Sequence, residues 1–153
     1  MKDKKRETFV FRGLGFPIKL INVPMRKMVG EWVIDVDFEK LQLTALLALL
    51  EKQAPLSGAE LKFIRKYLNM STTEFGKIFG VSHVAVIKWE KGTRANLSTD
   101  LCIRLYVYDH LLKIKDKDFR KFYQKNSLAE LAKNRNAKID PIAIDNFKEL
   151  KSA

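Results

Sequence analysis

The sequence predicts a mainly α protein with a small N-terminal β-rich module and a helical C-terminal extension. Two observations lead to this class. Short β-prone runs separated by Gly and Pro fill residues 8–35. From residue 37 to residue 112, apolar residues then recur with helical spacing in one segment after another. We therefore expect three parts, which are an N-terminal module over 1–55, a helical domain over 56–112 and a basic extension over 113–153.

The N-terminal part is expected to combine a curled antiparallel sheet with one apolar helix. Its β-prone runs are "TFVFRG", "FPIKLINVP", "MRKMVG" and "EWVIDV". The segment "DFEKLQLTALLALLEKQ" then predicts a helix from about Asp37 to Lys52 that is apolar around most of its waist. One small sheet cannot cover so wide an apolar surface. The helix is expected either to form a dimer interface or to pack on the next domain, and both alternatives stay open.

The middle part begins where "APLSG" at Ala54–Gly58 interrupts the helical pattern. Pro55 ends the preceding helix and Ser57 can cap the following one. Helices are expected over 57–68, 72–79, 83–90 and 98–112. The periodicity weakens after Lys113, where further helices are expected at 116–124, 128–134 and 141–150. Asp140 and Pro141 supply the cap and first residue of the last one.

The stretch "STTEFGKIFGVSHVAVIKWEKG", Ser71 to Gly92, predicts two short helices joined by a tight corner. Ser71 and Glu74 have the spacing of a capping box. Gly80 tolerates the left-handed backbone that turns the chain. Gly76 leaves room for the two helices to cross closely, and Ser82 is expected to cap the second helix. Val86 and Trp89 are expected to be its buried residues.

The segment "GVSHVAVIKWEKG" resembles the Cro and lambda-repressor (XRE) type of helix-turn-helix, with its Gly-Val-Ser corner and Trp-Glu-x-Gly ending. The resemblance covers Leu56 to Leu112 and implies a five-helix lambda-repressor-like domain. In it the second helix of the helix-turn-helix, expected over 83–90, reads the major groove. It also implies an ion pair between Arg65 and Glu90 that braces the recognition helix. The base-reading residues implied are His83, Val84, Ile87 and Lys88. The phosphate-binding residues expected are Thr72, Thr73, Ser82, Lys91, Thr93 and Arg94.

A second resemblance concerns the order of the parts. "FPIKLINVPMRKMVGEW", followed by a helix and then the DNA-binding unit, is similar to MqsA-type antitoxins. Those proteins hold zinc with N-terminal cysteine pairs, and residues 1–55 contain no cysteine. The resemblance therefore implies a zinc-free branch, with a toxin protein as a candidate partner.

The composition argues against several other classes. With one cysteine, Cys102, and two histidines, His83 and His110, the chain cannot build a structural zinc site or a disulfide framework. Both Cys102 and His110 are expected on the packed or half-buried surface of the helix at 98–112. No His, Asp, Glu and Ser cluster has catalytic spacing, so neither an enzyme nor a cofactor is expected. The longest apolar run, "LTALLALL", is too short to span a bilayer, which predicts a cytoplasmic protein with no membrane partner.

The net charge of +11 indicates a polyanionic partner. We expect a dimeric transcriptional regulator that binds a palindromic double-stranded operator and represses its own promoter. The main alternative is an antitoxin that binds a toxin and represses its own operon. A sequence-independent chromosomal or RNA binder is the remaining alternative, and a steep salt dependence without preference for an operator would identify it.

Overall fold

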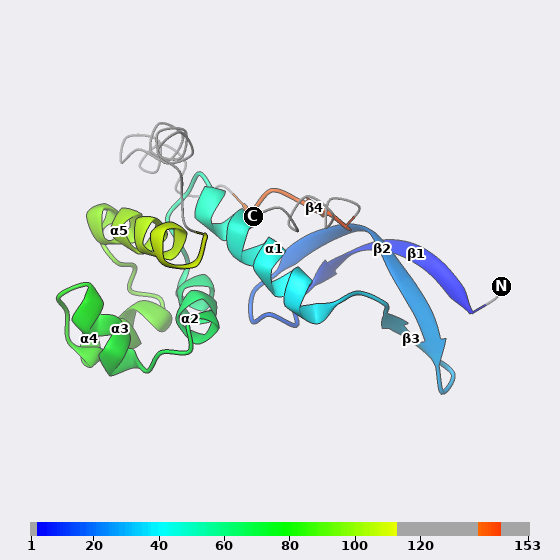
Figure 1. The fold of residues 1–153 in the computed structure, drawn as a ribbon, viewed down its shortest axis with the longest axis horizontal. Helices are drawn as coiled ribbons and strands as arrows, with labels where there is room; N and C mark the ends of the chain where they lie inside the picture. The colour runs from blue at the N-terminus through cyan, green and yellow to red at the C-terminus, as the bar shows by residue number, and fades with distance from the viewer. Residues whose placement is uncertain (1–2, 113–137, 145–153) are drawn as a thin grey trace. The chain divides into compact units, whose positions relative to one another are not determined.

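The computed structural model describes residues 3–112 and 138–144, and the chain divides into two compact units (Figure 1). The first unit comprises Met1–Ala48 and Ile139–Ala153, and the second comprises Leu49–Lys138. The division falls inside the apolar helix, a few residues before the boundary expected at Ala54–Gly58. The last described residues, 139–144, join the first unit instead of extending the second.

The first unit is built on a four-stranded sheet whose central strand is β2 (Ile18–Met28). β1 (Lys4–Phe11) and β3 (Glu31–Ile34) both pair with β2 in antiparallel register. β4 (Ile142–Ala143) pairs with β2 in parallel, opposite Leu20 and Ile21. A bulge interrupts the β1–β2 register between Glu7 and Phe9, where Asn22 has a positive φ of 58° and its N–H donates to Thr8 Oγ1 at 3.1 Å.

The expectation of a mainly α fold is wrong, because this sheet makes the protein mixed α/β. Two runs that the sequence separates at Pro24 form one continuous strand. A proline is tolerated there because its missing donor faces the end of β3, where Asp35 N–H donates to the Pro24 carbonyl at 2.8 Å. The helix expected at 141–150 is also wrong at its start, since Ile142–Ala143 form β4. The helices expected at 116–124 and 128–134 lie outside the described residues.

The core of the first unit lies on one face of the sheet. Alternate residues of β2 are buried while their neighbours face solvent. Helix α1 (Phe38–Glu51) follows β3, and Asp37 Oδ1 accepts the Glu39 N–H at 3.0 Å to cap it (Figure 1). Leu41, Ala45 and Leu46 of this helix are buried, and so are Leu49 and Leu50 in its last turn, which belongs to the second unit. Leu43 and Leu47 of the same helix are half-buried and Phe38 is 52% exposed, so a dimer interface and packing on the next domain both stay predictions for this helix.

The second unit is helical. It contains α2 (Gly58–Tyr67), α3 (Thr72–Ile78), α4 (His83–Glu90), α5 (Leu97–Val107) and a short π-helical turn, η1 (Tyr108–Leu112). The predicted helices at 57–68, 72–79 and 83–90 are confirmed to within a residue at each end. The helix expected over 98–112 is α-helical only as far as Val107. Buried side chains from all four α-helices form the core: Leu61, Phe63, Ile64, Phe75, Val86, Trp89, Leu101, Ile103 and Val107.

A buried polar network ties the start of this unit to α5. Arg104 is fully buried, and its guanidinium donates to Asp100 at 2.7 Å and to the carbonyls of Leu50, Lys52 and Ala54. The other oxygen of Asp100 accepts the Leu56 N–H at 2.7 Å. Arg104 thus satisfies the carbonyls where α1 ends, and every charge in the cluster has a partner.

Candidate nucleic-acid interface

A tight corner fixes the angle between α3 and α4. Gly80 has a φ of 71°, as its place in the sequence predicts, and the Val81 N–H donates to the Gly76 carbonyl at 2.9 Å. A Cβ at Gly76 would lie 2.6 Å from the Val81 carbonyl oxygen, so a side chain there would push the two helices apart. The corner therefore depends on glycine at both positions, for different physical reasons.

Serine residues cap the helices of this region. Ser82 Oγ accepts the Ala85 N–H at 3.3 Å and begins α4, and Ser71 Oγ accepts the Glu74 N–H at 3.1 Å and begins α3. The reciprocal capping box expected at Ser71 is incomplete, because the Glu74 carboxylate contacts the Ser71 hydroxyl at 3.2 Å. The complete box belongs to α2, where Ser57 and Glu60 exchange both hydrogen bonds.

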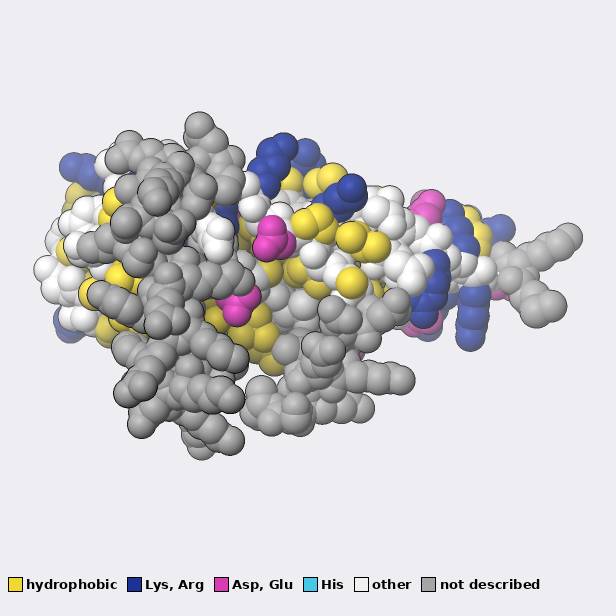
Figure 2. Space-filling model, turned by 90° about the horizontal axis from the view of Figure 1, so that it is seen from above, with side chains coloured by type: hydrophobic (Ala, Val, Ile, Leu, Met, Phe, Trp, Pro, Cys, Tyr) yellow, Lys and Arg dark blue, Asp and Glu magenta, His cyan; other side chains and the backbone are white. Residues whose placement is uncertain are grey.

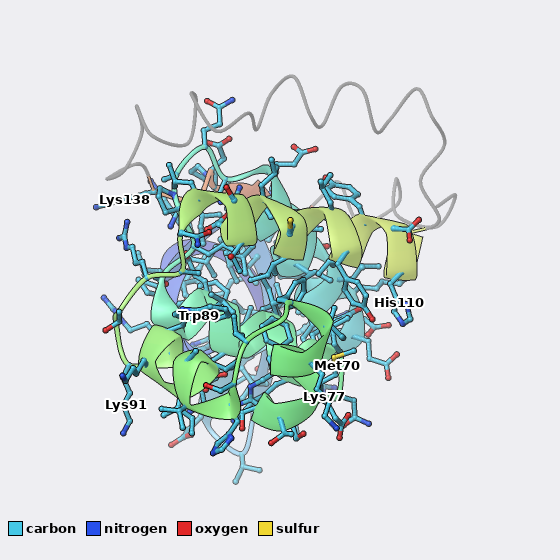
Figure 3. The ribbon with its side chains drawn as sticks, turned by 90° about the vertical axis from the view of Figure 1, so that its left-hand side faces the viewer. Met70, Lys77, Trp89, Lys91, His110 and Lys138 are labelled. Carbon is cyan, nitrogen blue, oxygen red and sulfur yellow. The ribbon has the colours of Figure 1, made fainter. Side chains whose placement is uncertain are left out.

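Helix α4 has one face in the core and one in solvent. Val86 and Trp89 are buried, and Figure 3 shows Trp89 inside the helical unit. Among the four residues expected to read bases, His83, Val84 and Lys88 are exposed, and Ile87 is half-buried. Val84 keeps 48% of its surface exposed. The solvent face of α4 therefore presents an imidazole, an ammonium and apolar groups together.

The residues expected to contact phosphates flank this face. Thr73 and Ser82 are exposed, and Thr72 is half-buried. Lys91, Thr93 and Arg94 follow α4 in an exposed turn, and Figure 3 shows Lys91 pointing away from the helices. Gly92, with a φ of 117°, and a hydrogen bond of 3.0 Å from Thr93 N–H to the Lys88 carbonyl shape this turn. Hydroxyl and cationic groups thus lie before and after the exposed face of α4.

Helix α2 holds the C-terminal end of α4 in place. Arg65 Nε donates to Glu90 Oε1 at 2.5 Å, and Arg65 Nη1 donates to the Met70 carbonyl at 2.9 Å. Both charged side chains are nearly buried, with 12% and 11% of their surface exposed. Arg65 therefore joins α2, the loop before α3 and the end of α4.

Gly58 has a role that the sequence analysis did not identify. A Cβ at this position would lie 2.5 Å from the Trp89 carbonyl oxygen and 2.6 Å from that of Glu90. The first residue of α2 therefore packs directly on the last turn of α4. The sequence signal was Gly directly after the Ser57 cap, at a position where most helices tolerate a side chain.

The expectation that Cys102 and His110 are packed or half-buried is wrong, since both side chains are exposed. His110 instead stacks on Tyr106 with the ring centroids 5.2 Å apart. Tyr106 in turn meets Phe79 edge to face, which joins α5 to the end of α3. Cys102 and His110 thus lie away from the buried stripe of α5.

Within residues 3–112 and 138–144, no three His, Cys, Asp or Glu side chains lie close enough to bind a metal ion. None of the helices in this part of the chain has the length and apolarity needed to cross a membrane. Comparisons with protein-family models, curated proteins and solved structures found no match. The resemblance to the XRE helix-turn-helix therefore stays a prediction from the sequence.

Proposed function

We propose that the second unit binds double-stranded DNA, with α3 and α4 acting as a helix-turn-helix and α4 entering the major groove. The observation that carries this proposal is the division of α4 into two faces. Its inner face is anchored by Val86 and Trp89, while His83, Val84 and Lys88 stay exposed. The eight residues of α4 present this exposed row to a groove wide enough for one helix.

The chemistry of the exposed row suits base edges. The Lys88 ammonium can donate to guanine O6 and N7 in the major groove. Val84 and Ile87 offer apolar contact to a thymine methyl, and the His83 ring can bond a base or a phosphate. Because only two of the four side chains form hydrogen bonds, the specificity also depends on methyl contacts and on DNA shape.

The flanking residues suit the DNA backbone. The exposed Lys91 and Arg94 lie past one end of α4, and Thr73 and Ser82 lie near the other. Such contacts orient a protein on the duplex without reading its sequence. The rigid brace between Arg65 and Glu90 favours this role, because base readout requires a recognition helix that keeps its angle.

A regulator that represses its own promoter remains the proposed biological role. One eight-residue helix contacts few base pairs, so useful affinity requires two copies on a palindromic site. We therefore propose a homodimer on DNA.

Replacing Lys88 by Ala tests the proposal. A preferred duplex is first selected from a random pool, and affinities are then measured on that duplex and on random DNA. Lys88→Ala is expected to lose about 1–3 kcal/mol on the preferred duplex and little on random DNA. Lys77→Ala is the matched control, because Lys77 is an exposed lysine at the far end of α3 and points away from the unit in Figure 3. An equal loss on both duplexes would contradict the role of Lys88 in base reading.

A further inference from the structure

The turn between β2 and β3 carries an unusual residue. Val29 and Gly30 form a two-residue turn between Met28 and Glu31, with φ values of 49° and 84°. Two positive φ values define a type I′ turn, which favours Asn-Gly, Asp-Gly or Gly-Gly. A β-branched residue with a positive φ is a genuine outlier. Val29 nevertheless occupies the position where Asn or Asp would fit without strain.

Within the described part of the chain, no packing contact of the Val29 side chain compensates for the backbone strain at this residue. The Val29 side chain is fully exposed, and its neighbour Met28 keeps 46% of its surface exposed. An apolar side chain that packs on nothing does not stabilise the sheet. Backbone strain that lacks a structural benefit suggests a function outside the chain.

The side of the sheet next to this turn is basic. The register places Lys4 opposite Arg26 and Val10 opposite Lys19, so these residues share the solvent-facing side with Arg6. Among the described residues of strands β1 to β3, four cations therefore lie on this side, and the carboxylates that share it are Glu31 and Asp35. Asp35 pairs with Arg26 at 3.7 Å, but both side chains are about half exposed, so this pair is weak. Figure 2 shows Lys and Arg side chains gathered over the end of the sheet where β1 begins and β2 meets β3.

We infer that this side of the sheet is a second DNA-binding surface, with Lys4, Lys19 and Arg26 on phosphates and the Met28–Val29 turn in the minor groove. The inference rests on the proposed DNA binding of the second unit. Apolar side chains flanked by cations are the groups that proteins insert between base steps in the minor groove, where they bend the duplex. The net charge of +11 favours DNA over a protein surface of mixed charge.

Val29→Asn in the full chain separates a binding role from a structural one. Asn fits the turn, so the midpoint of thermal unfolding should rise by roughly 2–4 °C. Affinity for a random duplex should nevertheless fall roughly tenfold, and bending of an end-labelled duplex, measured by energy transfer, should decrease. Val10→Thr changes an exposed valine on the same side of the sheet, far from the turn, and should leave the bending unchanged.

The double variant Lys4→Gln/Lys19→Gln tests the phosphate contacts. The slope of log affinity against log salt should decrease by roughly 1.8, which is about 0.9 for each lost contact. Lys62→Gln, in an exposed lysine of α2, is the control and should leave the slope unchanged.

The outcomes distinguish this inference from the function proposed for α4. If Val29→Asn changes neither affinity nor bending, the inference that the sheet binds DNA is wrong. If Lys88→Ala still loses its preference for the selected duplex in that case, the proposal for α4 stands. If Val29→Asn lowers affinity and bending but Lys88→Ala keeps the preference for the selected duplex, the inferred DNA contact of the sheet stands. Base reading by α4 is then wrong. If Val29→Asn instead lowers binding only to phosphatidylserine vesicles, or only self-association, the turn binds a lipid surface or a second copy and the inference is overturned.

Discussion

Replacing Arg104 by Met measures how much the buried polar network stabilises the helical unit. Arg104 is fully buried and donates to one carboxylate and three backbone carbonyls. Met has a similar length and donates nothing. A buried carbonyl left without a donor costs about 1–3 kcal/mol, and a buried ion pair broken on one side costs about 3–5 kcal/mol. These penalties overlap, and Asp100 keeps its bond from Leu56 N–H, so we expect a total loss of about 3–5 kcal/mol.

The assay is urea unfolding followed by circular dichroism, with Arg104→Lys measured beside Arg104→Met. Lys keeps the charge but lacks the planar fork that reaches several acceptors at once, so its loss should be intermediate. A double-mutant cycle with Asp100→Asn then isolates the coupling between the two side chains. A loss below about 1 kcal/mol for Arg104→Met would refute the reasoning, because no buried group would then depend on this side chain.

Four further substitutions test the packing and the helix caps that position α4. Trp89→Ala should lower the free energy of unfolding by about 3–5 kcal/mol in thermal or urea unfolding, and unchanged stability would mean that this ring does not close the core. Gly58→Ala should cost about 1–3 kcal/mol because the new Cβ meets backbone atoms of α4, whereas a gain in stability would show that α2 can move away. Ser57→Ala should cost more than Ser71→Ala, within the range of about 0.5–2 kcal/mol for lost caps, because only Ser57 belongs to a complete capping box; the reverse order in the same assay would contradict this account.

The helices of the second unit could be predicted because local chemistry specifies them. Ser57, Ser71 and Ser82 each cap a helix where the sequence pattern begins, and Gly80 turns the chain between two of them. The inner face of α4 followed from the helical spacing of Val86 and Trp89.

The full extent of the sheet could not be predicted from the sequence, because it depends on contacts between distant residues. The pairing of Leu20 with Ile142 joins segments that share no local signal, and Asp140-Pro141 resembles a helix start as much as a strand approach. Arg104 and Asp100 were missed because charged residues in a helical pattern usually face solvent. Their spacing of four residues, on the buried side of α5 with Ile103 and Val107, was the available signal.

The proposal that α4 reads DNA sequence can be tested by one binding measurement. Purified protein is titrated with DNA from upstream of its own gene and with random DNA of equal length across a salt series. If α4 reads bases, the upstream DNA should be preferred by roughly a thousandfold, and this preference should persist as salt rises. Parallel loss of both affinities, with no preference at any salt concentration, would contradict base reading and leave only binding through charge.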